Sequence, residues 1–246
     1  MIDLPTFEER VSAIDEESAR LAEVVSCVLD RPVASCPGWS GRDLAKHVAS
    51  VFTFWSHQLA SGDPHERQEP PRFEAGAAAD AVGWLDAAAG VLVESLSELG
   101  PEEPCWNWSG TDLDSGWVAR RMALEVAIHR YDGELAAGGP HDIALALSVD
   151  GIDERIDVHL RADIPEDRAA ALGGPLCLSC NDVDAAWVVD VGGGKLRYRR
   201  RAGPAAAVVR GSASQLFLFT WNRIGLEELD LTGERAVAEA WATLPV

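Results

Sequence analysis

The stretch RRMALEVAIHRYDGELAAG, residues 120–138, has the periodicity of a helix with a wide apolar face. Gly138, Gly139 and Pro140 end the pattern and are a strong helix terminator. Glu125 and His129 stand among its apolar residues, four positions apart. Side chains at that spacing lie on one face of a helix, with Cβ atoms about 5–6 Å apart. The stretch therefore predicts a helix that offers a carboxylate and an imidazole side by side.

Three more amphipathic stretches precede this helix, and proline- and glycine-rich loops separate them. Ser40 is a good N-cap for the second stretch, with Asp43 at the position that completes a capping box. Four amphipathic helices within about 140 residues indicate an all-α four-helix bundle. The predicted helices cover residues 6–30, 40–59, 74–99 and 115–137.

The pattern changes after residue 142. A short helix leads into strand-like runs, and DVGGGK between two of them is typical of a hairpin turn. Two helical segments follow. We therefore predict two domains, an all-α domain over 1–142 and a small α+β domain over 143–246. The expected elements of the second domain are a helix at 143–160, strands at 175–181, 185–191, 195–200 and 205–211, and helices at 212–224 and 234–243.

The composition limits the classes of molecule that the protein is expected to bind. The 246 residues carry a formal net charge of −19, so nucleic acid and anionic membrane surfaces are not expected partners. The sequence has no apolar run long enough to span a bilayer, and its acidic start does not resemble a secretory signal. A cytoplasmic location with five reduced cysteines follows as an expectation. Cys177 and Cys180 form one CxxC, which is more typical of strand thiols than of a zinc site.

A third side chain could complete a metal site with Glu125 and His129. His47 lies beside Leu44 and Val48 in the second predicted helix and is expected to face the bundle interior. A His–Glu–His set leaves open positions for water or a substrate thiol, as catalytic zinc sites do. The alternative is a solvated salt-bridge row that starts at Arg121, with His47 as a hydrogen-bonded core residue.

Two motifs carry a family resemblance. CPGWSGRDLAKHVASVFTFW (36–55) and the 120–138 stretch together resemble the mycothiol-dependent maleylpyruvate isomerase family. VVRGSASQLFLFTWNRIG (208–225) is similar to the C-terminal domain of that family. The resemblance implies a DinB-like four-helix bundle followed by a sterol-carrier-like domain. Carried over by position, the metal ligands of the family fall on His47, Glu125 and His129, and a catalytic arginine falls on Arg223.

Two positions depart from the family pattern. Many members have a second histidine where this chain has Leu124, and many have a tryptophan where it has Tyr131. Neither change removes an implied ligand, so both bear on the substrate and not on the metal.

The function implied by the resemblance is a metal-dependent, mycothiol-dependent isomerase or S-transferase. Zinc is the expected ion, mycothiol the thiol cosubstrate, and an actinobacterial cytosol the expected setting. The metal-bound thiolate would add to an electrophilic small molecule. With a maleylpyruvate-type cis-enoate, rotation and elimination give the trans isomer, whereas other electrophiles give a stable conjugate. Arg223 would clamp a substrate carboxylate, Asp132 would support the cluster, and the chain would be a monomer or weak homodimer.

Two other classes of function stay open from the sequence. One is a non-catalytic protein that binds a hydrophobic ligand in its second half. An apolar tunnel without a metal would favour this function. The other is a thiol-independent zinc hydrolase with water as the nucleophile. Activity without any thiol would distinguish this hydrolase from a thiol-dependent enzyme.

Overall fold

The computed structural model describes residues 2–69, 80–160 and 164–244. The chain divides into two compact units. The helical unit comprises Pro5–His141, and the sheet unit comprises Asp142–Val246 with the segment before Pro5. No helix among the described residues is long and apolar enough to cross a membrane.

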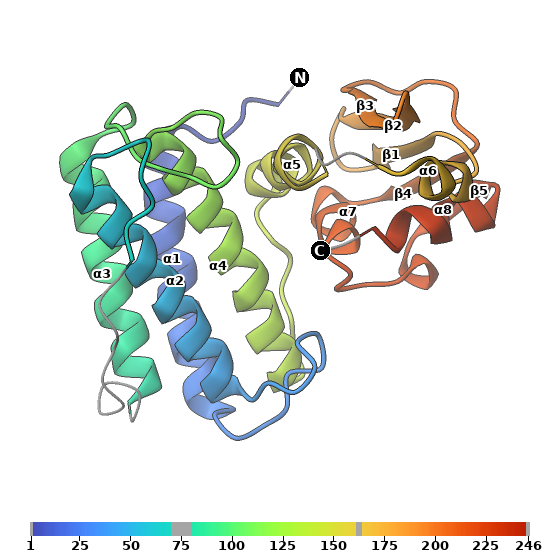
Figure 1. Cartoon of the computed structure of the whole chain (residues 1–246). Coiled ribbons are helices and arrows are strands. Elements are labelled where there is room, and N and C mark those ends of the chain that lie inside the picture. Colours follow the sequence, from blue (N-terminus) through green and yellow to red (C-terminus); the bar gives the residue numbers. More distant parts are fainter. Residues whose placement is uncertain (1, 70–79, 161–163, 245–246) are drawn as a thin grey trace. The chain divides into compact units, whose positions relative to one another are not determined.

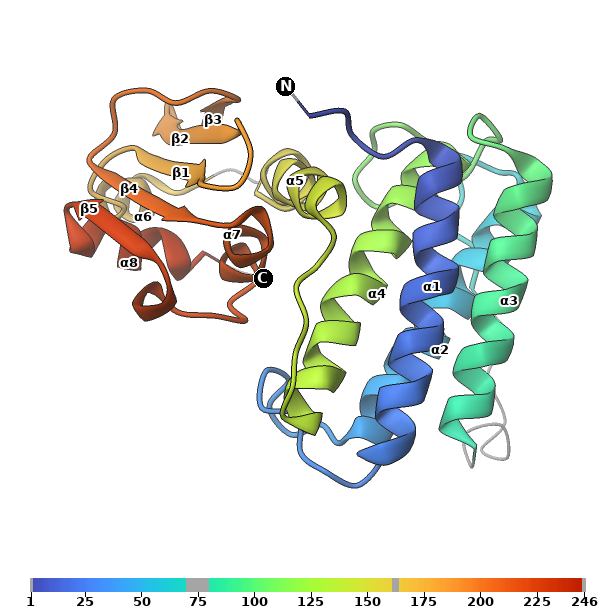
Figure 2. The same cartoon turned by 180° about the vertical axis from the view of Figure 1, so that it is seen from behind.

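The helical unit consists of four long helices that lie side by side (Figures 1 and 2). The helix α1 packs against both α3 and α4, and α2 packs against α3 and, less extensively, α4. The helix α4 is buried along most of its length, which agrees with the wide apolar face of its sequence. The bounds are α1 (Phe7–Cys27), α2 (Gly41–Ser61), α3 (Ala81–Leu99) and α4 (Ser115–Ala137).

Local capping sets the ends of the helices that carry the candidate ligands. Ser40 and Asp43 form a reciprocal capping box at the start of α2, as predicted. Asp114 accepts a hydrogen bond from the backbone N–H of Trp117 at the start of α4, and left-handed Gly138 (φ 94°) ends the helix. The predicted 115–137 helix is confirmed. The first helix ends at Cys27 and not at residue 30, and positions 74–79 of the third prediction lie outside the described residues.

A close contact and a buried ion network fix α4 against α1. A Cβ atom on Gly133 would lie 3.0 Å from Val24 and 3.2 Å from Leu21, so glycine permits the close approach of the two helices. One turn away, the buried Arg130 donates from Nε to Glu17 on α1 (2.7 Å) and from Nη1 to Glu134 (2.7 Å). The two features fix the rotation of α4, and with it the direction of the face that carries Glu125 and His129.

The sheet unit contains a five-stranded mixed sheet with the order β3-β2-β1-β4-β5. The pair β1–β4 is parallel and the other neighbours are antiparallel. The strands are β1 (Leu176–Cys180), β2 (Ala186–Gly192), β3 (Lys195–Arg199), β4 (Ala207–Gly211) and β5 (Asp230–Gly233). The helices are α5 (Leu145–Glu154), α6 (Glu166–Ala171), α7 (Ala213–Thr220) and α8 (Arg235–Ala242), with a π-helix at Arg155–His159 and a 3₁₀ turn at Leu226–Glu228.

The predicted helical region followed by a small α+β region is confirmed in outline. The four predicted strands are present, and Cys177 and Cys180 both lie in β1 as free thiols. The prediction from the sequence did not include α6 and β5. The element predicted at 212–224 is shorter, because α7 ends at Thr220 and Asn222 adopts a left-handed conformation (φ 57°).

Candidate metal centre

The helices α2 and α4 bring His47, Glu125 and His129 together. His47 Nε2 lies 3.1 Å and His129 Nε2 lies 3.3 Å from the same carboxylate oxygen, Oε1 of Glu125. The three candidate ligand atoms all lie within 4.8 Å of one another. The geometry therefore joins residues that are 78 positions apart in the sequence into a single cluster.

The cluster is buried on one side and open on the other. The side chain of His129 is 9% exposed and that of Glu125 is 16% exposed, whereas that of His47 is 34% exposed. An ion held by the three would thus be anchored in the helical unit, with a side that a small molecule can reach.

Arg121 accompanies Glu125 one turn earlier on α4, and the two side chains form an ion pair. Burial alone would raise the pKa of the Glu125 carboxyl, but Arg121 and the hydrogen bonds from His129 and His47 hold it well below its usual range. The carboxylate is therefore ionised. Arg121 is only 6% exposed, so the alternative of a solvated salt-bridge row does not describe these residues.

Asp132 orients the ring of His129. Its Oδ2 lies 2.9 Å from His129 Nδ1 and also accepts a hydrogen bond from Cys36 Sγ (3.5 Å). Burial would lower the pKa of His129, but hydrogen bonds with Asp132, Cys36 and Glu125 raise it well above its usual range. Because Asp132 holds Nδ1, the Nε2 atom is the one directed at Glu125 and His47.

Trp39 covers the two imidazoles. The centroid of its ring lies 4.7 Å from that of His47 and 6.3 Å from that of His129. The loop before α2 places it there: Val33 N–H donates to Trp39 O, Trp39 N–H donates to Cys36 O, and Gly38 adopts φ 87°. The sequence motif includes Trp39, but nothing in its spacing indicated a contact with both histidines.

The donor set fits a divalent transition metal. Two imidazole Nε2 atoms and a carboxylate oxygen are typical ligands of catalytic zinc, and such sites keep a further position for water or substrate. Metal-bound histidines commonly donate their other ring N–H to a carboxylate, as His129 does toward Asp132. Among the described residues, one other group of potential ligands is found, and it consists of Cys36, Asp132 and the same His129.

Arg223, the other predicted site residue, belongs to the sheet unit. It lies just after α7, is partly buried, and donates from Nη1 to the carbonyl oxygen of Trp221 (2.8 Å). Its predicted part in catalysis stays a prediction.

A unit of four long helices with a His–Glu–His cluster, followed by a unit with a small mixed sheet, defines a recognisable class of two-part protein. Residues 11–133 match the family model described as the mycothiol maleylpyruvate isomerase N-terminal domain. The chain belongs to the mycothiol maleylpyruvate isomerase family and is an enzyme of this type.

Solved structures agree with this assignment at the level of the fold. The crystal structure of the mycothiol-dependent maleylpyruvate isomerase and that of its histidine-to-alanine mutant each superpose with a TM-score of 0.56 at 15% identity. In both cases the match covers 95% of this chain and 97% of the other. A search of the curated proteins finds no match.

Proposed function

We propose that this chain is a metal-dependent, mycothiol-dependent isomerase or S-transferase. Its electrophilic substrate is either a maleylpyruvate-type cis-enoate, which would be isomerised, or another small electrophile, which would be conjugated. The observation that carries the proposal is the convergence of two histidine Nε2 atoms on Glu125 Oε1, with Asp132 holding the far side of His129. Family membership supports the thiol dependence.

The proposed ligands are His47, Glu125 and His129, and zinc is the proposed ion. A divalent ion at this place supplies positive charge that favours a thiolate over a thiol at neutral pH. Asp132 keeps His129 in the tautomer whose Nε2 can bind the ion. Arg121 offsets the charge of Glu125, and Trp39 shields the histidine rings from water on one side.

The remaining parts of the proposal concern the whole chain. We assign a DinB-like four-helix bundle to 1–142 and a sterol-carrier-like domain to 143–246, supported by the four long helices and the mixed sheet. Arg223 is proposed to bind a substrate carboxylate through paired guanidinium N–H groups. A cytoplasmic monomer or weak homodimer completes the proposal.

Metal content tests the core of the proposal. Untagged wild type and the variants His47→Ala, Glu125→Ala and His129→Ala are analysed by plasma mass spectrometry after purification with zinc present. His65→Ala, in the loop after α2, is the matched control. We expect about one zinc per chain in wild type and control, and loss in each ligand variant. A wild type without metal would overturn the proposed mechanism.

A thiol requirement separates this proposal from a zinc hydrolase. The zinc-loaded enzyme is offered cis-enoates and activated esters, each with and without mycothiol. Turnover of a cis-enoate only in the presence of the thiol supports the proposal. If ester hydrolysis does not change when mycothiol is omitted, the nucleophile is water and not a thiol.

A further inference from the structure

A second set of potential metal ligands lies on the far side of the His129 ring. Cys36, in the loop before α2, places its Sγ 3.5 Å from Oδ2 of Asp132, and the same oxygen lies 2.9 Å from Nδ1 of His129. Each of the three side chains offers one ligand atom, and these atoms all lie within 4.8 Å of one another. The fold thus joins a thiol, a carboxylate and an imidazole, with 96 positions between Cys36 and Asp132. We call this set the Cys36 cluster.

The separations in the Cys36 cluster fit the ligand shell of a tetrahedral ion. Zinc binds sulfur at about 2.3 Å and nitrogen or oxygen at about 2.0–2.2 Å, so two of its ligand atoms lie about 3.3–3.6 Å apart. The distance of 3.5 Å between Cys36 Sγ and Asp132 Oδ2 is already in this range. The distance of 2.9 Å between His129 Nδ1 and the same oxygen would have to widen by about 0.5 Å. An ion could therefore enter the cluster with small movements of the side chains.

The Cys36 cluster is enclosed on one side and reachable on the other. Asp132 and His129 are buried, whereas Cys36 is partly exposed. The Asp132 carboxylate and a Cys36 thiolate would supply two negative charges, which balance the charge of a divalent cation. Buried charges persist in proteins where they are paired or coordinate a metal. The cluster therefore suits a divalent ion that arrives from the side of Cys36.

The thiol determines which ions the Cys36 cluster selects. Thiolate ligands favour thiophilic ions, whereas sites that contain only nitrogen and oxygen ligands do not offer this preference. The set His47, Glu125 and His129 has nitrogen and oxygen ligands alone. Cadmium is a d¹⁰ ion like zinc and binds sulfur more strongly than zinc does. A cation of this kind should therefore prefer the Cys36 cluster.

His129 belongs to both sets of ligands, through different ring nitrogens. A neutral imidazole carries its proton on one nitrogen and offers a lone pair on the other. An ion on Nδ1 therefore leaves the proton on Nε2, which lies 3.3 Å from Oε1 of Glu125 and can donate to it. In that state Nε2 has no lone pair for an ion held with His47. One neutral ring can thus serve either set of ligands, but not both at once.

We propose that the Cys36 cluster is an alternative metal position, which takes one thiophilic divalent cation and excludes an ion from the set His47, Glu125 and His129. On binding, Cys36 releases its thiol proton to solvent, and the neutral His129 ring keeps its proton on Nε2. Binding at Cys36 does not depend on the proposed function. The exclusion rests on it, because the exclusion requires that the other set holds an ion.

Titration of the metal-free, full-length chain with cadmium chloride tests the binding, because a cadmium thiolate gives an ultraviolet charge-transfer band that nitrogen and oxygen ligands do not give. We expect a band that saturates at about one cadmium per chain. Cys36→Ser should remove the band. Cys27→Ser, at an exposed thiol, is the matched control and should retain it, as should Glu125→Gln. The proposal is overturned by a wild type without the band, by a band that Cys36→Ser leaves unchanged, or by one that Glu125→Gln removes.

X-ray absorption at the cadmium edge keeps the test decisive if Cys36→Ser does not fold. The measurement uses the Cys27→Ser protein, so that the exposed thiol is absent. We expect one sulfur and one imidazole nitrogen in the shell of the ion. A shell without sulfur would overturn the proposal.

Competition between the two metals tests the exclusion. Zinc-loaded protein is mixed with increasing cadmium chloride, desalted, and analysed for both metals by plasma mass spectrometry. Wild type should exchange its zinc for cadmium, and Cys36→Ser should need about tenfold more cadmium for the same loss of zinc. A wild type that holds zinc and cadmium together, with the charge-transfer band, would refute the exclusion. A wild type that never binds zinc would instead contradict the proposed function, and the cadmium titration would still decide the binding at Cys36.

Discussion

Asp132 and His129 form a buried hydrogen-bonded pair on consecutive turns of α4, with 2.9 Å between Oδ2 and Nδ1. This pair decides which ring nitrogen of His129 faces Glu125. It also joins the centre to the loop before α2, since Cys36 donates to the same carboxylate oxygen. The orientation of one proposed ligand thus depends on a residue outside the proposed ligand set.

Replacement of Asp132 by asparagine should weaken zinc binding about 10- to 100-fold, because the amide cannot fix the His129 tautomer as the carboxylate does. A competition titration with a chromophoric chelator measures the affinity. Asp86→Asn on α3 is the control for a lost surface charge. An Asp132→Asn protein that is folded and binds zinc as tightly as wild type would show that Asp132 does not position His129.

Asp43 should make the helical unit more stable above the acid range. Hydrogen bonds from the Ser40 side chain and backbone lower the pKa of Asp43 below its usual value. A carboxyl with a lowered native pKa stabilises the fold above its unfolded pKa and loses that contribution as the pH falls through the native pKa. We expect the free energy of unfolding to fall more steeply in wild type than in Asp43→Asn as the pH is lowered below about 5. Urea unfolding at each pH measures this free energy. If the free energy of unfolding changed with pH equally in the two proteins, the predicted contribution of Asp43 would be contradicted.

Glu17 should matter for stability because it neutralises a buried cation. Glu17→Gln removes one carboxylate partner of the Arg130 guanidinium, whose side chain is 1% exposed. The free energy of unfolding should fall by about 3 kcal/mol. Glu16→Gln, at the exposed neighbouring position, should change it by less than about 0.5 kcal/mol. Equal effects of the two substitutions in urea unfolding would show that the network contributes little.

Two glycine-to-alanine substitutions should have opposite signs. At Gly133 the new methyl group would lie 3.0 Å from Val24, so overpacking should destabilise the helical unit by about 1–3 kcal/mol. At Gly90, in the middle of α3, a methyl group meets nothing within 4 Å. Alanine there should stabilise the unit by about 0.5–1 kcal/mol, because it favours the helix. Thermal unfolding of both variants checks the pair, and a stabilising Gly133→Ala would refute the close approach of α1 and α4.

The cysteines should label in a fixed order with a thiol reagent near pH 8. Burial raises the pKa of both Cys105 and Cys180 to about 12, so their thiolates are scarce at that pH. Cys27 is exposed and should react first, in a fast phase that Cys27→Ser removes. Cys105, which is fully buried, should react only on unfolding. A native-state fast phase that persists in Cys27→Ser would contradict this order.

The sequence predicted α4 to the residue because its ends depend on local chemistry at Asp114 and Gly138. It also named the three side chains that converge, since helical spacing shows which residues share a face. The contact of Trp39 with both histidines depends on a loop conformation that spacing does not encode.

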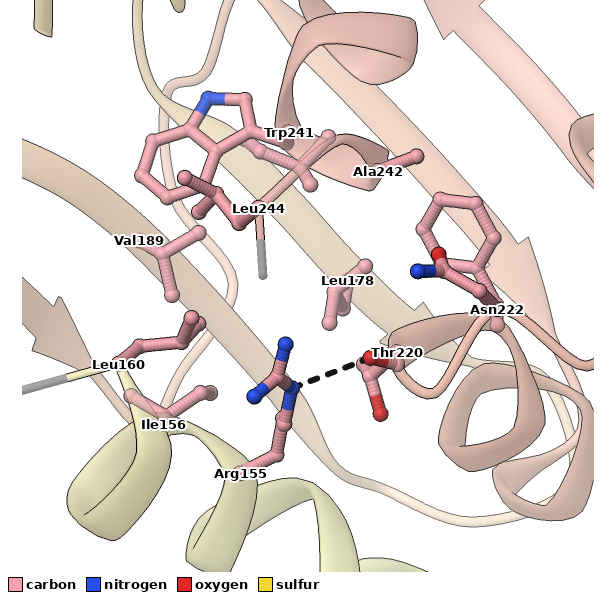
Figure 3. Close-up of a pocket in the computed structure, with 12 residues that line it drawn as sticks. Arg155, Ile156, Leu160, Leu178, Val189, Thr220, Asn222, Trp241, Ala242 and Leu244 are labelled. Atoms are coloured by element: carbon pink, nitrogen blue, oxygen red, sulfur yellow. Dashed lines mark hydrogen bonds between the residues drawn. The ribbon is translucent and has the colours of Figure 1, made fainter. Parts of the chain in front are cut away.

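In the sheet unit, too, some features could not be predicted from sequence patterns. The strand β5 is a short, largely exposed edge strand, so it lacks the apolar alternation by which a strand is predicted. The π-helix at Arg155–His159 continues the pattern of the preceding helix, and periodicity alone cannot distinguish the two. The apolar pocket of this unit (Figure 3) is lined by side chains from β1, β2, α7, α8 and the π-helix together, and no single stretch of sequence indicates it.

The long separation between His47 and Glu125 has a consequence for the making of the protein. During synthesis the first of these residues leaves the ribosome 78 positions before the second, and α3 is made in between. The nascent chain thus carries His47 without Glu125 and His129 until α4 has emerged and docked. The side on which His47 meets solvent is the side from which the proposed ion would reach the cluster. The complete His–Glu–His cluster therefore exists only once α4 has been made.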